Sequence, residues 1–142
     1  MQLISVVIGI VWVVMVLVSI GPFLFQWLKA RQANAPIPLP VMMAMRLRKV
    51  PVDLIVNAKI AAIKAGLSVD TNFLEAHYLA GGNVIDVIEA LRMAKNAGLE
   101  LNWTQACAID LAGKQRGLSV LAVVKTSIET NQSVFDVFKF KQ

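Results

Sequence analysis

Charged side chains are scarce in this sequence, and its N-terminal part has none before Lys29. Only 16% of the 142 residues are Asp, Glu, Lys or Arg, whereas ordinary soluble domains contain about 25%. The single cysteine, Cys107, excludes a disulfide within the chain. The single histidine, His77, has no cysteine or carboxylate at ligand spacing, so the sequence predicts no metal site.

Motifs of catalysis are missing as well. No carboxylates on adjacent helix turns suggest acid–base chemistry, and neither GxxxxGK(S/T) nor GxGxxG occurs. Cys107 has no histidine three or four residues away, and we predict it to be a small core residue. His77 is predicted to make a partly buried polar contact. Helical spacing predicts two exposed ion pairs, Asp110–Lys114 and Glu89–Arg92. The sequence thus predicts a protein that is not an enzyme and has no catalytic residue, cofactor or metal.

An apolar segment opens the chain. As a helix, residues 3–25 would be about 35 Å long, which suffices to cross a hydrocarbon core of about 30 Å. A buried core helix fits poorly, because so small a protein cannot cover it on all sides. A cleaved signal peptide also fits poorly, because no Lys or Arg precedes the apolar run. We therefore predict that residues 1–28 form a membrane anchor. Gly21-Pro22 leaves open a re-entrant hairpin that turns within the bilayer.

A basic segment, residues 29–49, follows the anchor. The net charge of +5 resides here, because the chain after residue 49 has nine basic and nine acidic residues. This position predicts contact with anionic lipids and a cytoplasmic location for the following domain, and it argues against nucleic-acid binding. Prolines at 36, 38 and 40 predict an extended, interfacial start that becomes helical from about Val41. The predicted membrane-surface contacts are Trp27, Lys29, Arg31, Arg46, Arg48 and Lys49.

Residues 50–130 have the periodicity of a helical domain. Apolar residues recur at three- and four-residue spacing, and polar caps and glycines separate the segments. The predicted helices run from Pro51 to Gly66, from Asp70 to Gly81, from Asn83 to Gly98, from Asn102 or Thr104 to Gly113, and from Leu118 to Ile128. The tail, residues 131–142, fits a short strand with Phe138 and Phe140 on one face, and a short helix is the alternative.

An internal repeat links these helices. The triplet AGL at 65–67 recurs at 97–99, and LAG at 79–81 recurs at 111–113, in each case 32 residues later. Stacked helix pairs with a period of about 30–45 residues are how helical solenoids are built. Since two units are few, we predict a mainly α fold: a transmembrane or re-entrant helix, then a small helical bundle with a two-unit helix-pair repeat.

Four longer motifs carry a resemblance to a known family. They are MRLRKVP at 45–51, IVNAKIAAIKAGL at 55–67, LEAHYLAGGNV at 74–84 and AIDLAGK at 108–114. With the apolar segments that precede them, they make residues 1–130 similar to the bacterial flotillin-like protein A family. The resemblance implies a non-enzymatic scaffold on the cytoplasmic face of the membrane, which forms large homo-oligomers and is associated with ordered membrane microdomains.

The family continues past these helices into an SPFH (prohibitin-homology) domain and a coiled-coil region. Neither is present in this sequence, which stops at Gln142, about where the strands of the SPFH domain would begin. We therefore expect either a short homologue with the membrane-proximal module alone or a fragment.

Two functions are compatible with these features. The first is a flotillin-like scaffold that self-associates at the cytoplasmic face of a bacterial inner membrane, with anionic lipids and copies of itself as partners. The second is a small accessory subunit that docks in a larger membrane complex through its single transmembrane helix and its helical domain. Neither function involves nucleic acid.

Overall fold

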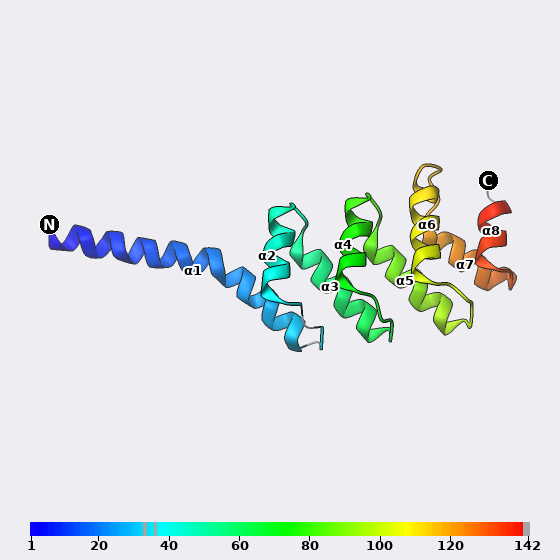
Figure 1. The fold of residues 1–142 in the computed structure, drawn as a ribbon, viewed down its shortest axis with the longest axis horizontal. Coiled ribbons are helices and arrows are strands. Elements are labelled where there is room, and N and C mark those ends of the chain that lie inside the picture. Colours follow the sequence, from blue (N-terminus) through cyan, green and yellow to red (C-terminus); the bar gives the residue numbers. More distant parts are fainter. Residues whose placement is uncertain (33, 36, 141–142) are drawn as a thin grey trace.

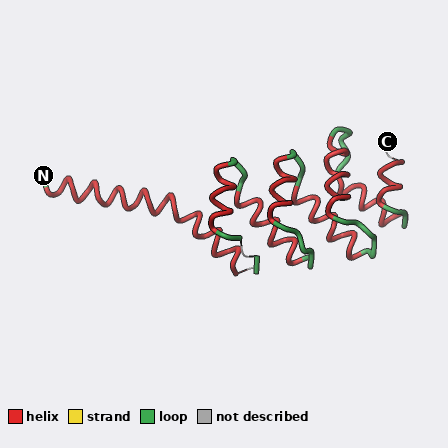
Figure 2. Tube along the Cα trace, viewed as in Figure 1, coloured by secondary structure: helices red, strands yellow, loops and turns green. Residues whose placement is uncertain are grey.

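The computed structural model describes all residues except 33, 36, 141 and 142, and the described residues form helices and no strand. A long N-terminal helix projects from a row of short helices that lie side by side (Figures 1 and 2). The mainly α prediction is confirmed. We call α2 to α8 the helix stack. The bounds are α1 Gln2–Gln32, α2 Leu39–Leu47, α3 Val52–Lys64, α4 Thr71–Leu79, α5 Val84–Asn96, α6 Trp103–Lys114, α7 Val120–Thr130 and α8 Val134–Phe140.

Helix α1 is continuous through Pro22 and ends only at Gln32. The helix therefore extends four residues beyond the anchor predicted for residues 1–28, and the break at Gly21-Pro22 that a re-entrant hairpin requires does not occur. A proline inside a helix removes one hydrogen bond, here to the carbonyl of Val18. The helix has intact turns on both sides of this point, so the loss does not end it.

The basic segment is helical over most of its second half. Helix α2 begins at Leu39, two residues before the predicted start at Val41. Pro38 is its N-cap, and Pro40 lies in the first turn. Backbone N–H groups in the first turn have no acceptor within the helix, so a proline there removes no hydrogen bond. Pro36, the first of the three prolines, lies outside the described residues.

The helix ends recur with one period. Helices α2, α4 and α6 begin at residues 39, 71 and 103, and helices α1, α3 and α5 end at residues 32, 64 and 96. A residue with positive φ follows each of these ends: Asn34 at 52°, Gly66 at 66° and Gly98 at 70°. In the first of these turns, the N–H of Ala35 donates to the carbonyl of Ala30 at 2.9 Å. The end of α1 therefore occupies the place that α3 and α5 occupy in the later helix pairs.

The helix pairs form an open row, which differs from the expected closed bundle (Figure 1). Within the row, α1 packs on α3, α3 on α5, and α5 on α7. Three buried apolar clusters follow one another along it, and they include Met42, Leu74 and Val123 respectively. A row of this kind leaves a face of α2 that no earlier stack helix covers.

Residues 134–140 form α8, so the strand prediction for the tail is wrong and the helical alternative is correct. The Ser133 hydroxyl accepts a hydrogen bond from the N–H of Asp136 at 3.2 Å. Val134 and Val137 are both buried in the cluster that α8 shares with α7. A three-residue separation places these valines on one side of a helix, whereas a strand would place them on opposite faces.

The predicted polar caps are confirmed by their hydrogen bonds. Asp70 accepts from the N–H of Asn72, and Asn83 accepts from the N–H of Asp86. Of the two caps predicted for α6, Asn102 is the one observed, and it forms a reciprocal capping box with Gln105.

Candidate membrane-anchoring site

The apolar part of α1 has no covering protein. Its most apolar 18-residue window is 0% buried, and it is the one helix among the described residues that is long and apolar enough to cross a membrane. Trp12 and Phe25 are each 68% exposed. Soluble monomers rarely expose continuous apolar surface on this scale. At about 1.5 Å per residue, the 31 residues of α1 are about 46 Å long, which exceeds a hydrocarbon core of about 30 Å.

The C-terminal turns of α1 are part of the helix stack. Ala30 is 1% exposed, and Phe23 and Trp27 pack against the cluster that contains Met42 and Val56. Because the helix continues without interruption from its exposed apolar part into this cluster, no flexible linker separates the anchor from the stack. Figure 1 shows the helix stack directly continuous with the C-terminal end of α1.

Two of the predicted membrane-surface residues lie together at the end of α1. The guanidinium of Arg31 lies over the ring of Trp27, with 5.2 Å from Cζ to the ring centroid. Lys29, on the same helix, donates from Nζ to Oδ1 of Asn57 at 2.7 Å. These side chains therefore lie next to the apolar segment, and they also contact other residues of the chain.

The other three residues of the predicted set lie at the end of α2. Arg48 donates to Oε1 of Glu75 at 2.7 Å, and the Glu75 side chain is only 5% exposed. The side chains of Arg46 and Lys49 have no hydrogen bond or ion pair among the described residues. The structure therefore gives four of the six residues a protein partner, and their contact with a membrane surface stays a prediction.

A buried polar pair joins α4 to α6. Nε2 of His77 lies 2.9 Å from Oδ2 of Asp110, and the two side chains are 3% and 9% exposed. The same carboxylate oxygen accepts from the N–H of Asn83 at 2.7 Å. The ring of Trp103 lies edge-on to His77, with 5.9 Å between the ring centroids. This arrangement connects two successive helix pairs through polar side chains that are almost fully buried.

The Asp110–Lys114 ion pair predicted from spacing is absent from the described contacts, so this prediction is wrong. Asp110 faces inward to His77, while Nζ of Lys114 donates to the carbonyl of Gly81 at 2.5 Å. Helical spacing shows which residues share a face, but it does not show which face meets a neighbouring helix. The other predicted pair, Glu89 with Arg92, is confirmed on the surface.

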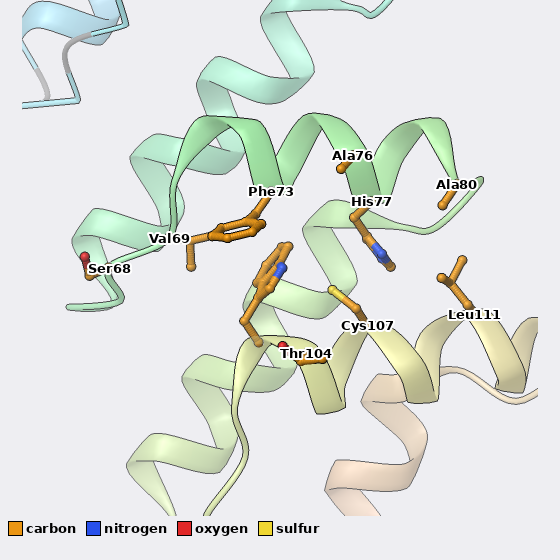
Figure 3. Close-up of a pocket in the computed structure, with 10 residues that line it drawn as sticks. Ser68, Val69, Phe73, Ala76, His77, Ala80, Thr104, Cys107 and Leu111 are labelled. Carbon is orange, nitrogen blue, oxygen red and sulfur yellow. The ribbon is translucent and has the colours of Figure 1, made fainter.

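Cys107 lines a shallow groove between α4 and α6, beside His77 (Figure 3). Burial, with a smaller contribution from the charge of Asp110, raises the pKa of the Cys107 thiol to about 12. No group of three or more His, Cys, Asp or Glu among the described residues could hold a metal ion. The groove therefore offers an inert thiol and apolar walls, which suit packing better than chemistry.

Cys107 should react slowly with thiol reagents. A pKa of about 12 reduces the fraction of Cys107 that is thiolate at pH 8 about a thousandfold. A more basic thiolate is also a stronger nucleophile, which offsets part of this reduction in rate. We expect alkylation about 30- to 60-fold slower than at an exposed cysteine. Iodoacetamide kinetics on the folded chain in detergent measure the rate. The reference is Ala108→Cys in a Cys107→Ser chain, since residue 108 is exposed. Equal rates at the two positions would show that the thiol is not buried.

Comparison with known protein families supplies what the geometry alone does not. The family model described as "Flotillin-like protein FloA" matches residues 3–138. The chain belongs to this family. FloA proteins are flotillin-like and non-enzymatic, which agrees with the prediction made from the missing motifs. The FloA match includes most of α1 and nearly all of the helix stack, so the anchor and the stack are both parts of the family's pattern.

Curated FloA relatives match the chain over most of its length. The Opitutus terrae flotillin-like protein FloA is 45% identical over 124 residues, which cover 87% of this chain and 37% of the relative. The Protochlamydia amoebophila protein of the same name is 45% identical over 122 residues, covering 85% and 34%. The chain thus spans about a third of the length of the curated relatives it matches. No solved structure matches it.

Proposed function

We propose that this protein is a membrane-anchored, flotillin-like scaffold that self-associates at the cytoplasmic face of a bacterial inner membrane, within ordered membrane domains. The observation that carries the proposal is α1: its apolar part is 0% buried, and it continues without a break into the helix stack. A rigid connection of this kind fixes the direction of every stack relative to the bilayer. Neighbouring copies would then present their stacks side by side in one orientation.

Charge supports the cytoplasmic location. The first charged side chains of α1 are Lys29 and Arg31, in its last turn. Basic residues next to a membrane helix are retained on the cytoplasmic side. Helix α2 adds Arg46 immediately afterwards, so positive charge lies on the stack side of the apolar segment only.

Self-association is supported by apolar side chains on the stack surface. Phe73 is 59% exposed and Leu79 is 56% exposed, both on α4. Phe73 also borders the groove of about 450 Å³ between α4 and α6, together with Trp103 and Leu111 (Figure 3). Exposed aromatic residues around an apolar groove are typical of surfaces that bind another protein.

The mass of the complex extracted from native membranes tests this proposal. Polymer-bounded membrane discs followed by mass photometry and proteomics would give both the copy number and the composition. We expect several copies of this chain and no stoichiometric second polypeptide. Phe73→Ser together with Leu79→Ser should lower the copy number, whereas Asn72→Ser with Ala108→Ser, at exposed positions of α4 and α6, should not.

A mass that corresponds to a single copy would overturn self-association. A single copy found with other polypeptides would instead establish the accessory-subunit function. Both results would leave the membrane anchor itself intact, because α1 does not depend on the stack surface.

A further inference from the structure

The outward face of α2 is the least protected apolar surface of the helix stack. Met43 is 61% exposed and Leu47 is 87% exposed, and Leu39, one turn before Met43, is 36% exposed. These residues are four positions apart, so they form one stripe along the helix. Terminal repeats of stacked helix proteins normally need a polar outer face to remain soluble. The apolar stripe therefore indicates that this end of the stack does not face water.

The later helix pairs show what covers this face elsewhere. Helix α4 begins 32 residues after α2, so Glu75 occupies the position of Met43. Glu75 is 4% exposed and binds Arg48 from the preceding pair, although Leu79, in the position of Leu47, is still 56% exposed. Cys107, in the same position of α6, is partly buried as well. At α2 no earlier stack helix exists, and the uncovered face looks along α1 toward its apolar segment (Figure 1).

A cleft lies where this face meets α1. Its volume is about 540 Å³, and its lining is apolar except for one hydroxyl and one guanidinium: Ser19, Ile20, Phe23, Met43, Arg46 and Leu47. A hydrocarbon core of about 30 Å takes about 20 helical residues, so a crossing that starts at Leu3 ends near Pro22. The cleft is therefore at the level where acyl chains meet phosphate groups.

Arg46 provides the charge in this cleft. The other two arginines of the basic segment are engaged, with Arg31 over a tryptophan ring and Arg48 on Glu75. Arg46 is exposed, and its guanidinium has no hydrogen bond or ion pair among the described residues. A guanidinium matches the geometry of a phosphate through two parallel hydrogen bonds. An unpaired guanidinium above an apolar cleft is complementary to a molecule with an anionic head and an apolar tail.

We propose that the cleft between α1 and α2 binds one anionic phospholipid, with its phosphate on Arg46 and an acyl chain against Met43 and Leu47. This inference rests on the proposed function in one respect, namely that α1 crosses the bilayer. The lipid occupies the place that the preceding helix pair occupies at α4 and α6. The bound lipid covers the apolar face at the α2 end of the stack and attaches this end to the leaflet surface.

Lipid retention by the full chain tests the site. The chain is reconstituted in vesicles of equal phosphatidylglycerol and phosphatidylcholine, transferred to detergent and examined by native mass spectrometry. We expect one retained phosphatidylglycerol per chain, in preference to phosphatidylcholine. Arg46→Gln should reduce this retention about fivefold, as expected for the loss of one interfacial cation. Arg116→Gln is the matched control, because Arg116 is exposed in the turn after α6, away from the cleft.

The apolar part of the site has its own matched pair. Leu47→Gln should also reduce retention, whereas Ile128→Gln, on α7 at a distance from the cleft, should not. Leu47 and Ile128 are both exposed, so neither change threatens folding. Equal retention in Arg46→Gln and Arg116→Gln, or no preference for phosphatidylglycerol in the unchanged chain, would overturn the site.

Flotation of the same samples separates this failure from failure of the proposed function. The unchanged chain and Arg46→Gln should both float with vesicles, because α1 is the same in each. An unchanged chain that does not float would overturn the anchor and the lipid site together. An unchanged chain that floats but shows no Arg46-dependent retention would overturn the lipid site alone.

Discussion

Two lysines in the middle of α1, Val11→Lys with Val14→Lys, should release the chain from membranes. Both valines are exposed, at 57% and 52%, so the substitutions disturb no packing within the chain. A lysine at the centre of a membrane helix costs about 2.5–3.5 kcal/mol on insertion scales. Two of them therefore remove about 5–7 kcal/mol of anchoring free energy. Density-gradient flotation of cell membranes should show the chain moving from the floating fraction to the soluble or aggregated fraction.

The matched control for this variant carries the same added charge elsewhere. Ala108→Lys with Gln132→Lys places two lysines at exposed positions of the helix stack, and this chain should float as the unchanged protein does. If the α1 variant also floats, attachment depends on some surface other than α1. The basic segment or the face of α2 would then be the first alternatives to test.

Removal of the buried carboxylate, Asp110→Ala, should destabilise the helix stack by about 3 kcal/mol. The substitution leaves the buried His77 without its partner and also removes the acceptor of the partly buried N–H of Asn83, since Oδ2 of Asp110 serves both. Breaking a buried pair by removing one member typically costs about 3–5 kcal/mol. Chemical denaturation of the full chain in detergent, followed by circular dichroism, measures the loss in free energy of unfolding.

Two further variants isolate the cause of this loss. Glu89→Ala removes a carboxylate from an exposed pair with Arg92 and should change stability by no more than about 1 kcal/mol. Asp110→Asn keeps an acceptor oxygen and should be destabilised less than Asp110→Ala. A loss in Asp110→Ala no larger than that in Glu89→Ala would show that the buried pair does not hold α4 and α6 together.

Local signals in the sequence were sufficient for most of the helices. Each predicted helix has its cap at Asp70, Asn83 or Asn102. Such caps can be predicted from the sequence, because the side chain accepts a hydrogen bond from an N–H only two or three residues later. The same argument explains the error at the tail. Alternation of phenylalanines suggested a strand, while the Val134–Val137 spacing that packs α8 on α7 is a helical signal that was overlooked.

Contacts between distant residues could not be predicted from spacing. Arg48 with Glu75 and His77 with Asp110 join residues that lie 27 and 33 positions apart. Their pairing depends on how successive helix pairs stack, and a search within one helix cannot reveal it. Likewise, the continuity of α1 into the stack could not be read from Gly21-Pro22, since that dipeptide also fits a turn.

Cysteine accessibility on the two sides of the membrane tests the central claim most directly, namely that α1 crosses the bilayer once and holds the stack in the cytoplasm. In a Cys107→Ser chain, single cysteines replace Gln2 or Ala108, and both positions are exposed. A membrane-impermeant maleimide should label Gln2→Cys from outside intact spheroplasts and Ala108→Cys only in inverted vesicles. Labelling of both cysteines from the same side would contradict the account.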